Sequence, residues 1–235
     1  MVLMNNDVTQ TKVFVISLRR ATERREHISK QMQEQNIPFE FIDAVDGRTL
    51  TEEQKSLADL ALAEELLGHT LVPGEIGCAL SHIGVYEKMV TENIASCIIL
   101  EDDMNFDSQF KNIILKIEAL KNNWELIYLF HGKAKSWPLK RALAPGFKLV
   151  RYRFPSKNSK RTIISSVGYM LTLEGAKKML KVAYPIRMPS DYLLGRIQKT
   201  RLKTYGVEPS CMQTGIFQTT IQDRNYGPHG ENKSN

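Results

Sequence analysis

The first fifty residues carry the pattern that most constrains the fold. Residues 13–18 (VFVISL) are apolar and precede two arginines, which is typical of a buried strand with a polar end. A helix is expected from Thr22, its predicted N-cap, to about Gln35. Residues 39–42 then alternate between apolar and polar, as a second strand does. A strand, a helix and a strand within about thirty residues predict a βαβ unit and therefore a parallel sheet.

Segments of strand and helix character continue to alternate beyond this unit. Helices are expected at residues 51–68, from Pro73, from the predicted cap Asp107, at 173–182 and after Pro189. Strands are expected at residues 97–100, 126–130 and 162–171. Residues 131–160 are expected to form a loop that carries one strand at 147–154. This order predicts one α/β domain over residues 1–228, followed by a disordered tail at 229–235.

The composition is that of an ordinary globular protein, with 42% hydrophobic and 25% charged residues. We expect neither a signal peptide nor a membrane span, because no apolar run approaches ~18 residues. The three cysteines, Cys78, Cys97 and Cys211, are odd in number and widely spaced, which argues against a disulfide framework and indicates a reducing compartment. Because none of them forms a CxxC pair, no zinc site is expected.

Charge is distributed unequally along the chain, whose formal net charge is +6. Residues 1–110 hold 9 Lys/Arg and 19 Asp/Glu, for a net charge of −10, whereas residues 111–235 hold 23 and 7, for a net charge of +16. Residues 133–161 hold ten basic residues and no acidic one. This asymmetry predicts a polyanionic partner, and nucleic acid, an anionic membrane surface and a phosphorylated glycolipid all fit. A solvated basic loop is the alternative interpretation.

Three acidic residues, Glu101-Asp102-Asp103, directly follow the apolar strand at 97–100. A carboxylate beside a core loses hydration, and a divalent cation shared with the diphosphate of a nucleotide is the usual replacement. In open α/β sheets, ligands bind beyond the carboxyl ends of the strands, where these acids lie. Because side chains alternate, positions 101 and 103 are expected on one side, one for a sugar and the other for a metal. A helix cap or a solvated acidic loop remains the alternative.

The end of the first strand offers further candidates, Ser17, Arg19, Arg20 and Arg24. Backbone groups and guanidinium groups at this position could hold a nucleotide, because arginine binds phosphate with a forked pair of donors. The same arginines could instead pair with glutamates on the following helix. The sequence contains neither a GxGxxG nor a P-loop motif, so neither a Rossmann dinucleotide site nor a Walker NTPase is supported.

Single candidate residues follow elsewhere, each with a structural alternative. Asp43 and Asp46 lie at the end of the second strand. Their carboxylates could bind a ligand, or they could belong to a plain Asp-Gly turn. Ser81 and His82 lie on the helix that begins near Pro73, and a helical histidine is often a structural hydrogen-bonding group. Asp191 begins a short helix in the basic half, where it is either a favourable N-terminal charge or a general base.

Read together, residues 12–222 resemble glycosyltransferase family 25, the lipooligosaccharide biosynthesis transferases. The segments that carry the resemblance occur in order along the chain: VFVISLRRATERREHI, IPFEFIDAVDG, PGEIGCALSHIGVYEKM, IILEDD, ELIYL, SSVGYMLTLEGAKKML, PSDYL and a Gln213…Thr219-Thr220-Ile221 ending. Each segment is modest alone, and their order and spacing make the match specific.

The resemblance implies a GT-A fold, a nucleotide-diphosphosugar transferase domain with a mainly parallel sheet flanked by helices. It implies an inverting transfer of galactose or glucose from a UDP-sugar to a hydroxyl of a lipooligosaccharide or lipopolysaccharide core, with Mn²⁺ or Mg²⁺ on the diphosphate. A cytoplasmic location follows, with peripheral contact at the anionic inner face of a bacterial inner membrane. The basic half would then hold a phosphorylated acceptor.

The resemblance also implies roles for individual residues. Asp103 would be the metal ligand, Glu101 or Asp102 would contact the ribose or the donor sugar, and Asp191 would be the base. The donor or its uridine would be bound by Ser17, Leu18, Arg20, Arg24, Asp43 and Asp46, with Ser81 and His82 near the donor. Gln213 matches a late glutamine of unassigned role, and no histidine matches the late metal ligand of some GT-A enzymes.

Three alternatives stay open at this point. Another metal–nucleotide enzyme, such as a nucleotidyltransferase, would usually add a Gly-rich loop and acids for a second metal, and neither is visible. A nucleic-acid-binding protein without catalysis fits the pI of about 9.1, but no nucleic-acid motif is present and the N-terminal half is acidic, so no nucleic-acid partner is expected. A family member that has lost activity is disfavoured by the intact acids at 101–103 and at Asp191.

Overall fold

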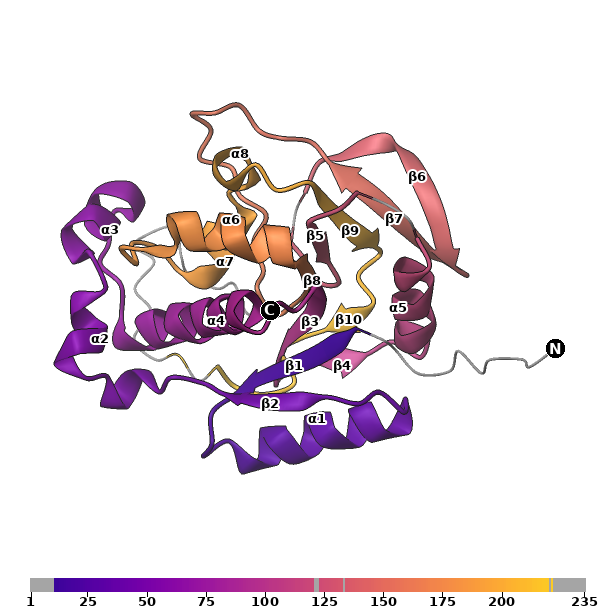
Figure 1. The fold of residues 1–235 in the computed structure, drawn as a ribbon, viewed down its shortest axis with the longest axis horizontal. Helices are drawn as coiled ribbons and strands as arrows, with labels where there is room; N and C mark the ends of the chain where they lie inside the picture. Colours follow the sequence, from indigo (N-terminus) through magenta and orange to yellow (C-terminus); the bar gives the residue numbers. More distant parts are fainter. Residues whose placement is uncertain (1–10, 121–122, 133, 220, 222–235) are drawn as a thin grey trace, which may run out of the picture.

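A computed structural model describes residues 11–120, 123–132, 134–219 and 221, so the tail expected at 229–235 lies outside the described residues. Among the described residues, eight strands form one sheet in the order β2-β1-β3-β8-β5-β9-β7-β6 (Figure 1). The bounds are β1 Lys12–Ser17, β2 Glu40–Asp43, β3 Ser96–Glu101, β5 Leu126–Tyr128, β6 Ser136–Ala144, β7 Phe147–Tyr152, β8 Gly168–Thr172 and β9 Thr204–Glu208. A small antiparallel pair joins β4 (Asn105–Phe106) to β10 (Met212–Gln213).

The βαβ unit is confirmed, and it brings the predicted site residues to one edge of the sheet. The strand β1 is parallel to both β2 and β3, with Ser17 opposite Asp43 and Ile16 opposite Glu101. The connecting helix α1 is Thr22–Glu34, with Ala21 rather than Thr22 at the N-cap position. Within the described sheet, only β7 and β8 run against the direction of the other strands. The expected α/β fold with a mainly parallel sheet is therefore confirmed.

The remaining helices flank the sheet. Their bounds are η1 Gly47–Thr49, α2 Glu52–Ser56, α3 Leu60–Leu67, α4 Pro73–Thr91, α5 Phe110–Glu118, α6 Leu173–Ala183, α7 Ser190–Gly195 and α8 Ile197–Thr200. No helix of the described residues has the length and apolar character needed to span a bilayer.

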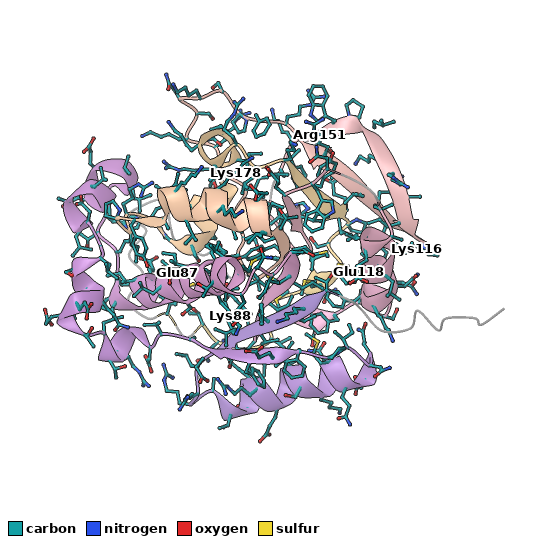
Figure 2. The ribbon with its side chains drawn as sticks, viewed as in Figure 1. Glu87, Lys88, Lys116, Glu118, Arg151 and Lys178 are labelled. Carbon is teal, nitrogen blue, oxygen red and sulfur yellow. The ribbon has the colours of Figure 1, made fainter. Side chains whose placement is uncertain are left out.

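The strand expected at 147–154 is confirmed as β7, but the expectation of a loop before it is wrong, because β6 pairs with β7 as a hairpin at the edge of the sheet. Leu143, Phe147 and Leu149 are buried in the core. The exposed positions of β6 include Pro138, Lys140 and Arg141, which hide the strand pattern. Arg151 is exposed on β7 (Figure 2). Lys140, Arg141 and Lys148 are also exposed, so the hairpin presents a charged surface.

Other boundaries also differ from the sequence expectations. The single helix expected at 51–68 is two helices, because the intervening backbone pairs with Ile186: Asp59 N donates to Ile186 O and Ile186 N to Leu57 O. The strand expected at 162–171 is only β8, which begins at Gly168. Asp107 lies before α5 and accepts a hydrogen bond from Gln109 N. The strands β9 and β10 were not predicted from the sequence.

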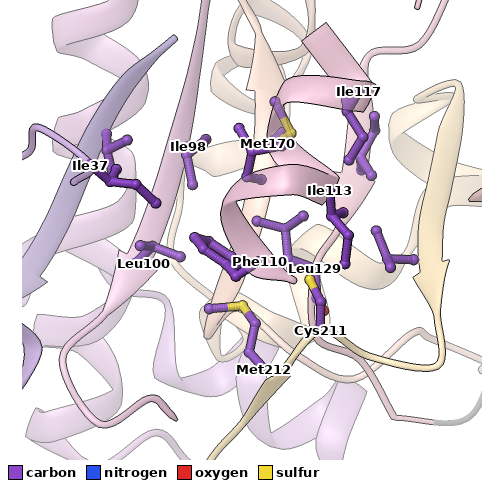
Figure 3. Packing of buried hydrophobic residues seen from close by; sticks show 14 of the residues in the cluster. Ile37, Ile98, Leu100, Phe110, Ile113, Ile117, Leu129, Met170, Cys211 and Met212 are labelled. Atoms are coloured by element: carbon purple, nitrogen blue, oxygen red, sulfur yellow. The ribbon is translucent and has the colours of Figure 1, made fainter. Parts of the chain in front are cut away.

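Two hydrophobic layers cover the two faces of the sheet. Alternate residues of β1 point to opposite faces, so that Val13 and Val15 join one cluster and Phe14 and Ile16 the other. The first cluster holds the apolar faces of α1 and α5, including Phe110 beside Leu100 and Met170 (Figure 3). The second holds α4 and α6. Burial on both faces explains why the central strands are apolar runs.

Helix α4 packs closely against the segment that follows β2. Pro73 occupies its first turn, and the Glu75 carboxylate accepts a hydrogen bond from Val72 N. A Cβ on Gly77 would lie 2.6 Å from the carbonyl oxygen of Val45, so only glycine permits this approach. The close packing fixes the face of α4 that carries Cys78 and His82 against the carboxyl end of β3.

Candidate active site

A cleft of ≈ 270 Å³ opens where the parallel strands end. Its walls come from α1, α4, the acidic residues after β3, residues 164–167, the start of α7, and Thr214, Thr219 and Ile221. Glu101, Asp103 and Asp191 all line this cleft. Residues far apart in the sequence are thus brought together beyond the carboxyl ends of the strands, the position at which open α/β sheets bind ligands.

Asp103 is half-buried and lies among other charges. Its Oδ2 atom lies 3.9 Å from Nη2 of Arg24. Its Oδ1 atom is buried and accepts no hydrogen bond from any residue that the structure describes. Burial, and then the nearby Glu101 carboxylate, raise the pKa of Asp103 from its ordinary value of 3.8 to about 6. A carboxylate that has lost water without gaining donors is a suitable ligand for a cation.

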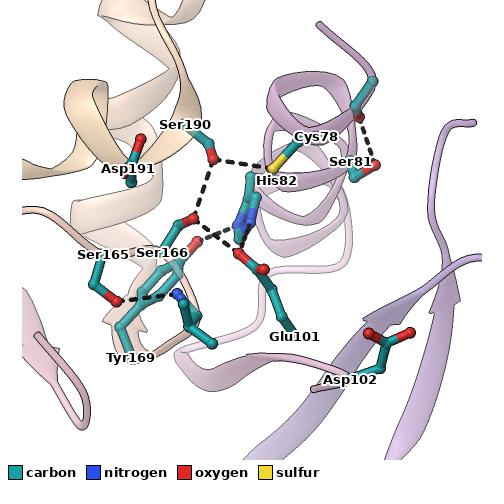
Figure 4. Close-up of polar contacts among 12 residues, drawn as sticks. Cys78, Ser81, His82, Glu101, Asp102, Ser165, Ser166, Tyr169, Ser190 and Asp191 are labelled. Carbon is teal, nitrogen blue, oxygen red and sulfur yellow. Dashed lines mark hydrogen bonds and ion pairs between the residues drawn. The ribbon is translucent and has the colours of Figure 1, made fainter. Parts of the chain in front are cut away.

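Glu101 lies at the end of β3 and faces α4 (Figure 4). One of its oxygens, Oε1, accepts a hydrogen bond of 2.9 Å from Ser166 Oγ and lies 3.4 Å from Nε2 of His82. Asp102 points away from this group, so positions 101 and 103 share one side, as the alternation of side chains predicts.

A buried chain of hydrogen bonds stands behind Glu101. His82 Nδ1 is 2.8 Å from the Tyr169 hydroxyl, which is 2.8 Å from the Tyr86 hydroxyl. Burial raises the pKa of both tyrosines, so both remain protonated donors. The neutral imidazole has two tautomers here: it accepts from Tyr169 at Nδ1 with its proton on Nε2, or it donates from Nδ1 to Tyr169 and leaves a lone pair on Nε2. The chain orients the imidazole toward the cleft.

Asp102 is 5% exposed and is held by two donors. Ser17 Oγ donates to its Oδ2 at 2.6 Å, and Arg24 Nη1 donates to its Oδ1 at 2.7 Å. Ser17 and Asp102 thus form a hydrogen-bonded chain with Arg24, which lines the cleft and lies beside Asp103.

The aspartates that end β2 are engaged by arginines. Asp43 accepts from Arg25 at 2.6 Å and from Arg19 at 2.7 Å, and these hydrogen bonds lower the pKa of Asp43. Asp46 accepts from Arg20 at 2.7 Å, and this bond, with those of Arg48, lowers the pKa of Asp46.

These pairs and the half-buried Leu18 lie beside Ser17 at the ends of β1 and β2. The residues that the family resemblance assigns to uridine are thus neighbours, and Arg24 is the member of that set that lines the cleft.

Ser81 is buried in contact with backbone. Its hydroxyl accepts a hydrogen bond from Val45 N at 2.9 Å and donates to Gly77 O at 2.7 Å. Gln213 is exposed on β10, where it pairs with Asn105 across the small sheet, one residue before Thr214 in the cleft wall. Ser81 and Gln213 are thus near cleft-lining residues in the sequence, but neither lines the cleft itself.

Asp191 is the second residue of α7. Its Oδ1 atom accepts a hydrogen bond of 2.8 Å from Tyr192 N, which is an interaction of the first turn of a helix. The side chain is half-buried and lines the cleft across from the acidic residues after β3. Asp191 is thus a helix N-terminal charge that also lines the candidate site, and its role as a general base stays a prediction.

Several further residues of the cleft wall were not singled out from the sequence, among them Glu75, Cys78, Ser166 and Ser190. The first two precede His82 by seven and four positions, so helical periodicity places all three on one face of α4 and could have identified them. The two serines lie in segments without a periodic pattern, and only the three-dimensional contacts with Glu101 and with each other reveal them.

Residues 10–194 match the model of glycosyltransferase family 25 (LPS biosynthesis protein). "Probable inactive glycosyltransferase 25 family member 3" of Bos taurus is 34% identical over 193 residues, which cover 78% of this chain and 31% of that protein. "Procollagen galactosyltransferase 2" of Homo sapiens is 28% identical over 177 residues, covering 72% of this chain and 27% of that protein. The chain thus spans less than a third of the length of these two relatives.

A solved structure described as "Crystal structure of a glycosyltransferase involved in the glycosylation of the major capsid of PBCV-1" aligns with a TM-score of 0.35 and 11% identity. The alignment covers 73% of this chain and 65% of that chain. The family match covers most of the sequence and includes β1, the acidic residues after β3 and the start of α7. The chain belongs to glycosyltransferase family 25.

Proposed function

We propose that this chain is an inverting hexosyltransferase that moves galactose or glucose from a UDP-sugar to a hydroxyl of a lipooligosaccharide or lipopolysaccharide core sugar. The observation that carries the proposal is the cleft in which Glu101 and Asp103 face Asp191. The description of the family model supports the acceptor class, and the printed name of the human relative supports galactose.

The residues of the cleft fit a divalent cation such as Mn²⁺ or Mg²⁺. The buried Oδ1 atom of Asp103 accepts no hydrogen bond within the described chain, and hard divalent cations prefer carboxylate oxygens. Asp103 would hold the ion, with Glu101 on the same side of the backbone. When bound, the ion supplies positive charge for the departing diphosphate.

The chain's own residues supply the remaining chemistry. The acceptor hydroxyl attacks the anomeric carbon, the bond between that carbon and the diphosphate oxygen breaks, and UDP leaves with the electron pair. Asp191 takes the hydroxyl proton, as a carboxylate base in the cleft can. Arg24, held by Asp102 on one side, adds a fixed positive charge to the wall where the diphosphate would lie.

The β6–β7 hairpin fits a polyanionic acceptor. Its exposed side chains include Lys140, Arg141, Lys148 and Arg151. The apolar side chains of Trp137 and Leu139 are also exposed, at 49% and 88%. A phosphorylated glycolipid at the cytoplasmic face of an anionic membrane offers both a negative charge and an apolar surface. This surface supports a peripheral location of the enzyme during acceptor binding.

An inactive member of the family is the second candidate, because the Bos taurus relative carries the words "probable inactive" in its name. The carboxylates at positions 101, 103 and 191 all line the cleft of this chain, which favours activity. Such a protein would bind the donor and release no UDP.

The test is UDP release from a panel of UDP-sugars, with and without Mn²⁺, in the presence of a truncated lipooligosaccharide acceptor. Metal-dependent release with UDP-galactose or UDP-glucose is the expected result. The same samples are followed by thermal unfolding, because a donor that binds the folded state must stabilise it. Donor stabilisation without UDP release for any acceptor would favour the inactive candidate, and no effect of any donor would overturn the transferase.

A further inference from the structure

Cys78, His82 and Glu101 converge at the cleft, where Cys78 and Glu101 line the wall and His82 is buried behind them, although sequence analysis predicts no zinc site. Cys78 and His82 are four residues apart on α4 and therefore share one face of the helix. Glu101 meets this face from the end of β3. One ligand atom from each residue lies within 4.8 Å of those of the other two. A thiol, an imidazole and a carboxylate thus come together at the spacing of a metal site.

Each of the three side chains is oriented by a further contact. The Tyr169 hydroxyl holds Nδ1 of His82 at 2.8 Å, and Ser166 Oγ donates to Glu101 Oε1 at 2.9 Å. Ser190 Oγ lies 3.2 Å from Cys78 Sγ (Figure 4). Metal ligands in proteins usually have such outer partners, which fix the tautomer of a histidine and the rotamer of a carboxylate.

The second nitrogen of His82 is the decisive atom. The residue is 1% exposed, and Nε2 makes no hydrogen bond within the described part of the chain. It lies 3.4 Å from Oε1 of Glu101. Two ligands bound to zinc at about 2.0–2.1 Å are separated by roughly this distance in a tetrahedron. The imidazole is therefore fixed on one side and presents its other nitrogen to the place where an ion would lie.

We propose that Cys78, His82 and Glu101 form a Zn²⁺ site, distinct from the oxygen site at Asp103. A thiolate, a neutral imidazole and a carboxylate are the ligands that Zn²⁺ selects, whereas Mn²⁺ and Mg²⁺ prefer oxygen. Binding releases the thiol proton to solvent as the sulfur–zinc bond forms. Cys78 and Glu101 line the cleft, so the fourth zinc position faces the space where a ligand binds.

A consequence follows that rests on the proposed function. Glu101 lines the cleft in which the donor is proposed to bind, so an ion held by Glu101 competes with the UDP-sugar. Zn²⁺ is then an inhibitor whose effect the donor reduces. The binding of the ion itself needs no donor, which allows the two proposals to be tested separately.

The experiment is a titration of the full chain with Co²⁺ and then Zn²⁺ in the absence of nucleotide, followed by absorbance. A cobalt–thiolate charge-transfer band that Zn²⁺ abolishes is expected for the wild type. Cys78→Ser is expected to lose the band and to weaken Zn²⁺ binding by at least about tenfold. Cys211→Ser is the matched control, because Cys211 is buried in the core and this variant is expected to keep the band.

Thermal unfolding without metal shows whether each variant is folded, and half-buried Cys78 is expected to tolerate serine. Asp103→Asn is expected to keep the cobalt band but to lose the UDP release that Mn²⁺ supports in the wild type. No band in the wild type, or an unchanged band in folded Cys78→Ser, would overturn the zinc site. Loss of the band in Asp103→Asn would overturn its separation from the oxygen site.

Discussion

Arg24 and Asp102 form an ion pair in the wall of the cleft, with Nη1 2.7 Å from Oδ1 and 12% and 7% of the two side chains exposed. Ser17 binds the second oxygen of Asp102, and Arg24 also donates to Gln218 O at 2.8 Å. The guanidinium lies 5.4 Å from the centre of the Phe217 ring. The pair therefore joins α1, the end of β3 and the segment that precedes Thr219 in the cleft wall.

Arg24→Met should destabilise the protein by about 3–5 kcal/mol, because it leaves the buried Asp102 carboxylate without its counter-charge. Adding Asp102→Leu should recover much of this loss, since an apolar pair can replace a buried ion pair at little cost. Chemical denaturation of the wild type, both single variants and the double variant measures the coupling. An Arg24→Met protein as stable as the wild type would show that the Asp102 carboxylate does not need the charge of Arg24.

Asp103→Asn should stabilise the metal-free protein above pH 6 and leave its stability unchanged below pH 4. The pKa of Asp103 is about 6 in the folded state against an ordinary 3.8, so the folded state holds a proton that the unfolded state releases. The contribution of this proton to the free energy of unfolding is fully present below about pH 4 and is lost as pH rises through about 6. At 1.36 kcal/mol per pKa unit, the loss is about 3 kcal/mol. Thermal unfolding in a chelating buffer across this range gives the difference.

Asp43→Asn supplies a control of opposite sign. Hydrogen bonds from Arg25 and Arg19 lower the pKa of Asp43, so this carboxylate stabilises the protein above its ordinary pKa, and the contribution is lost as pH falls. Asp43→Asn should therefore destabilise at neutral pH, with an effect that shrinks in acid. A stability difference for Asp103→Asn that does not change between pH 4 and 7 would contradict the assignment of desolvation as its cause.

The positions of the acidic residues followed from the sequence because strand ends obey general rules. Parallel strands place their carboxyl ends at one edge, so Ser17, Asp43 and Glu101 could be expected together once β1, β2 and β3 were recognised. Side-chain alternation then separated Asp102 from its two neighbours. The different partners of Glu101 and Asp102 were not predictable, because Arg24 and Ser166 come from distant segments of the chain.

The strand β6 was not predicted because its signals conflict. Pro138 and the basic residues suggest a loop, whereas Leu143 and Phe147 are buried beside α5. An edge strand tolerates proline and favours charge, so tertiary packing overrides the local pattern. The break between α2 and α3 has a similar origin, because it depends on backbone pairing with Ile186, more than a hundred residues away.

Tyr169→Phe should destabilise the protein by about 1–3 kcal/mol, because it leaves His82 Nδ1 and the Tyr86 hydroxyl without their shared partner. It should also lower kcat, since His82 would no longer be held toward Glu101. Tyr86→Phe removes the far end of the chain and keeps the contact between Tyr169 and His82, so its effect on kcat should be smaller. Equal effects of the two substitutions on kcat would assign the chain to stability alone.

Lys148→Glu with Arg151→Glu should raise the KM for a phosphorylated acceptor and leave the KM for the donor unchanged. Both side chains are exposed on β7, outside the cleft. Wild-type acceptor binding should weaken as salt rises, because screening removes attraction between exposed charges. Lys30→Glu, exposed on α1, is the control for a change in net charge elsewhere. Acceptor affinity that is independent of salt and of these substitutions would exclude the hairpin from acceptor binding.

Asp191→Asn should reduce kcat by roughly 10²–10⁴-fold, the usual contribution of a general base, while donor binding persists. An asparagine oxygen can still accept the hydrogen bond from Tyr192 N, so the start of α7 should keep its structure. UDP release measures turnover, and donor-induced thermal stabilisation measures binding in the same samples. Near-normal turnover would remove Asp191 from the mechanism, and loss of donor stabilisation would reassign it to donor binding.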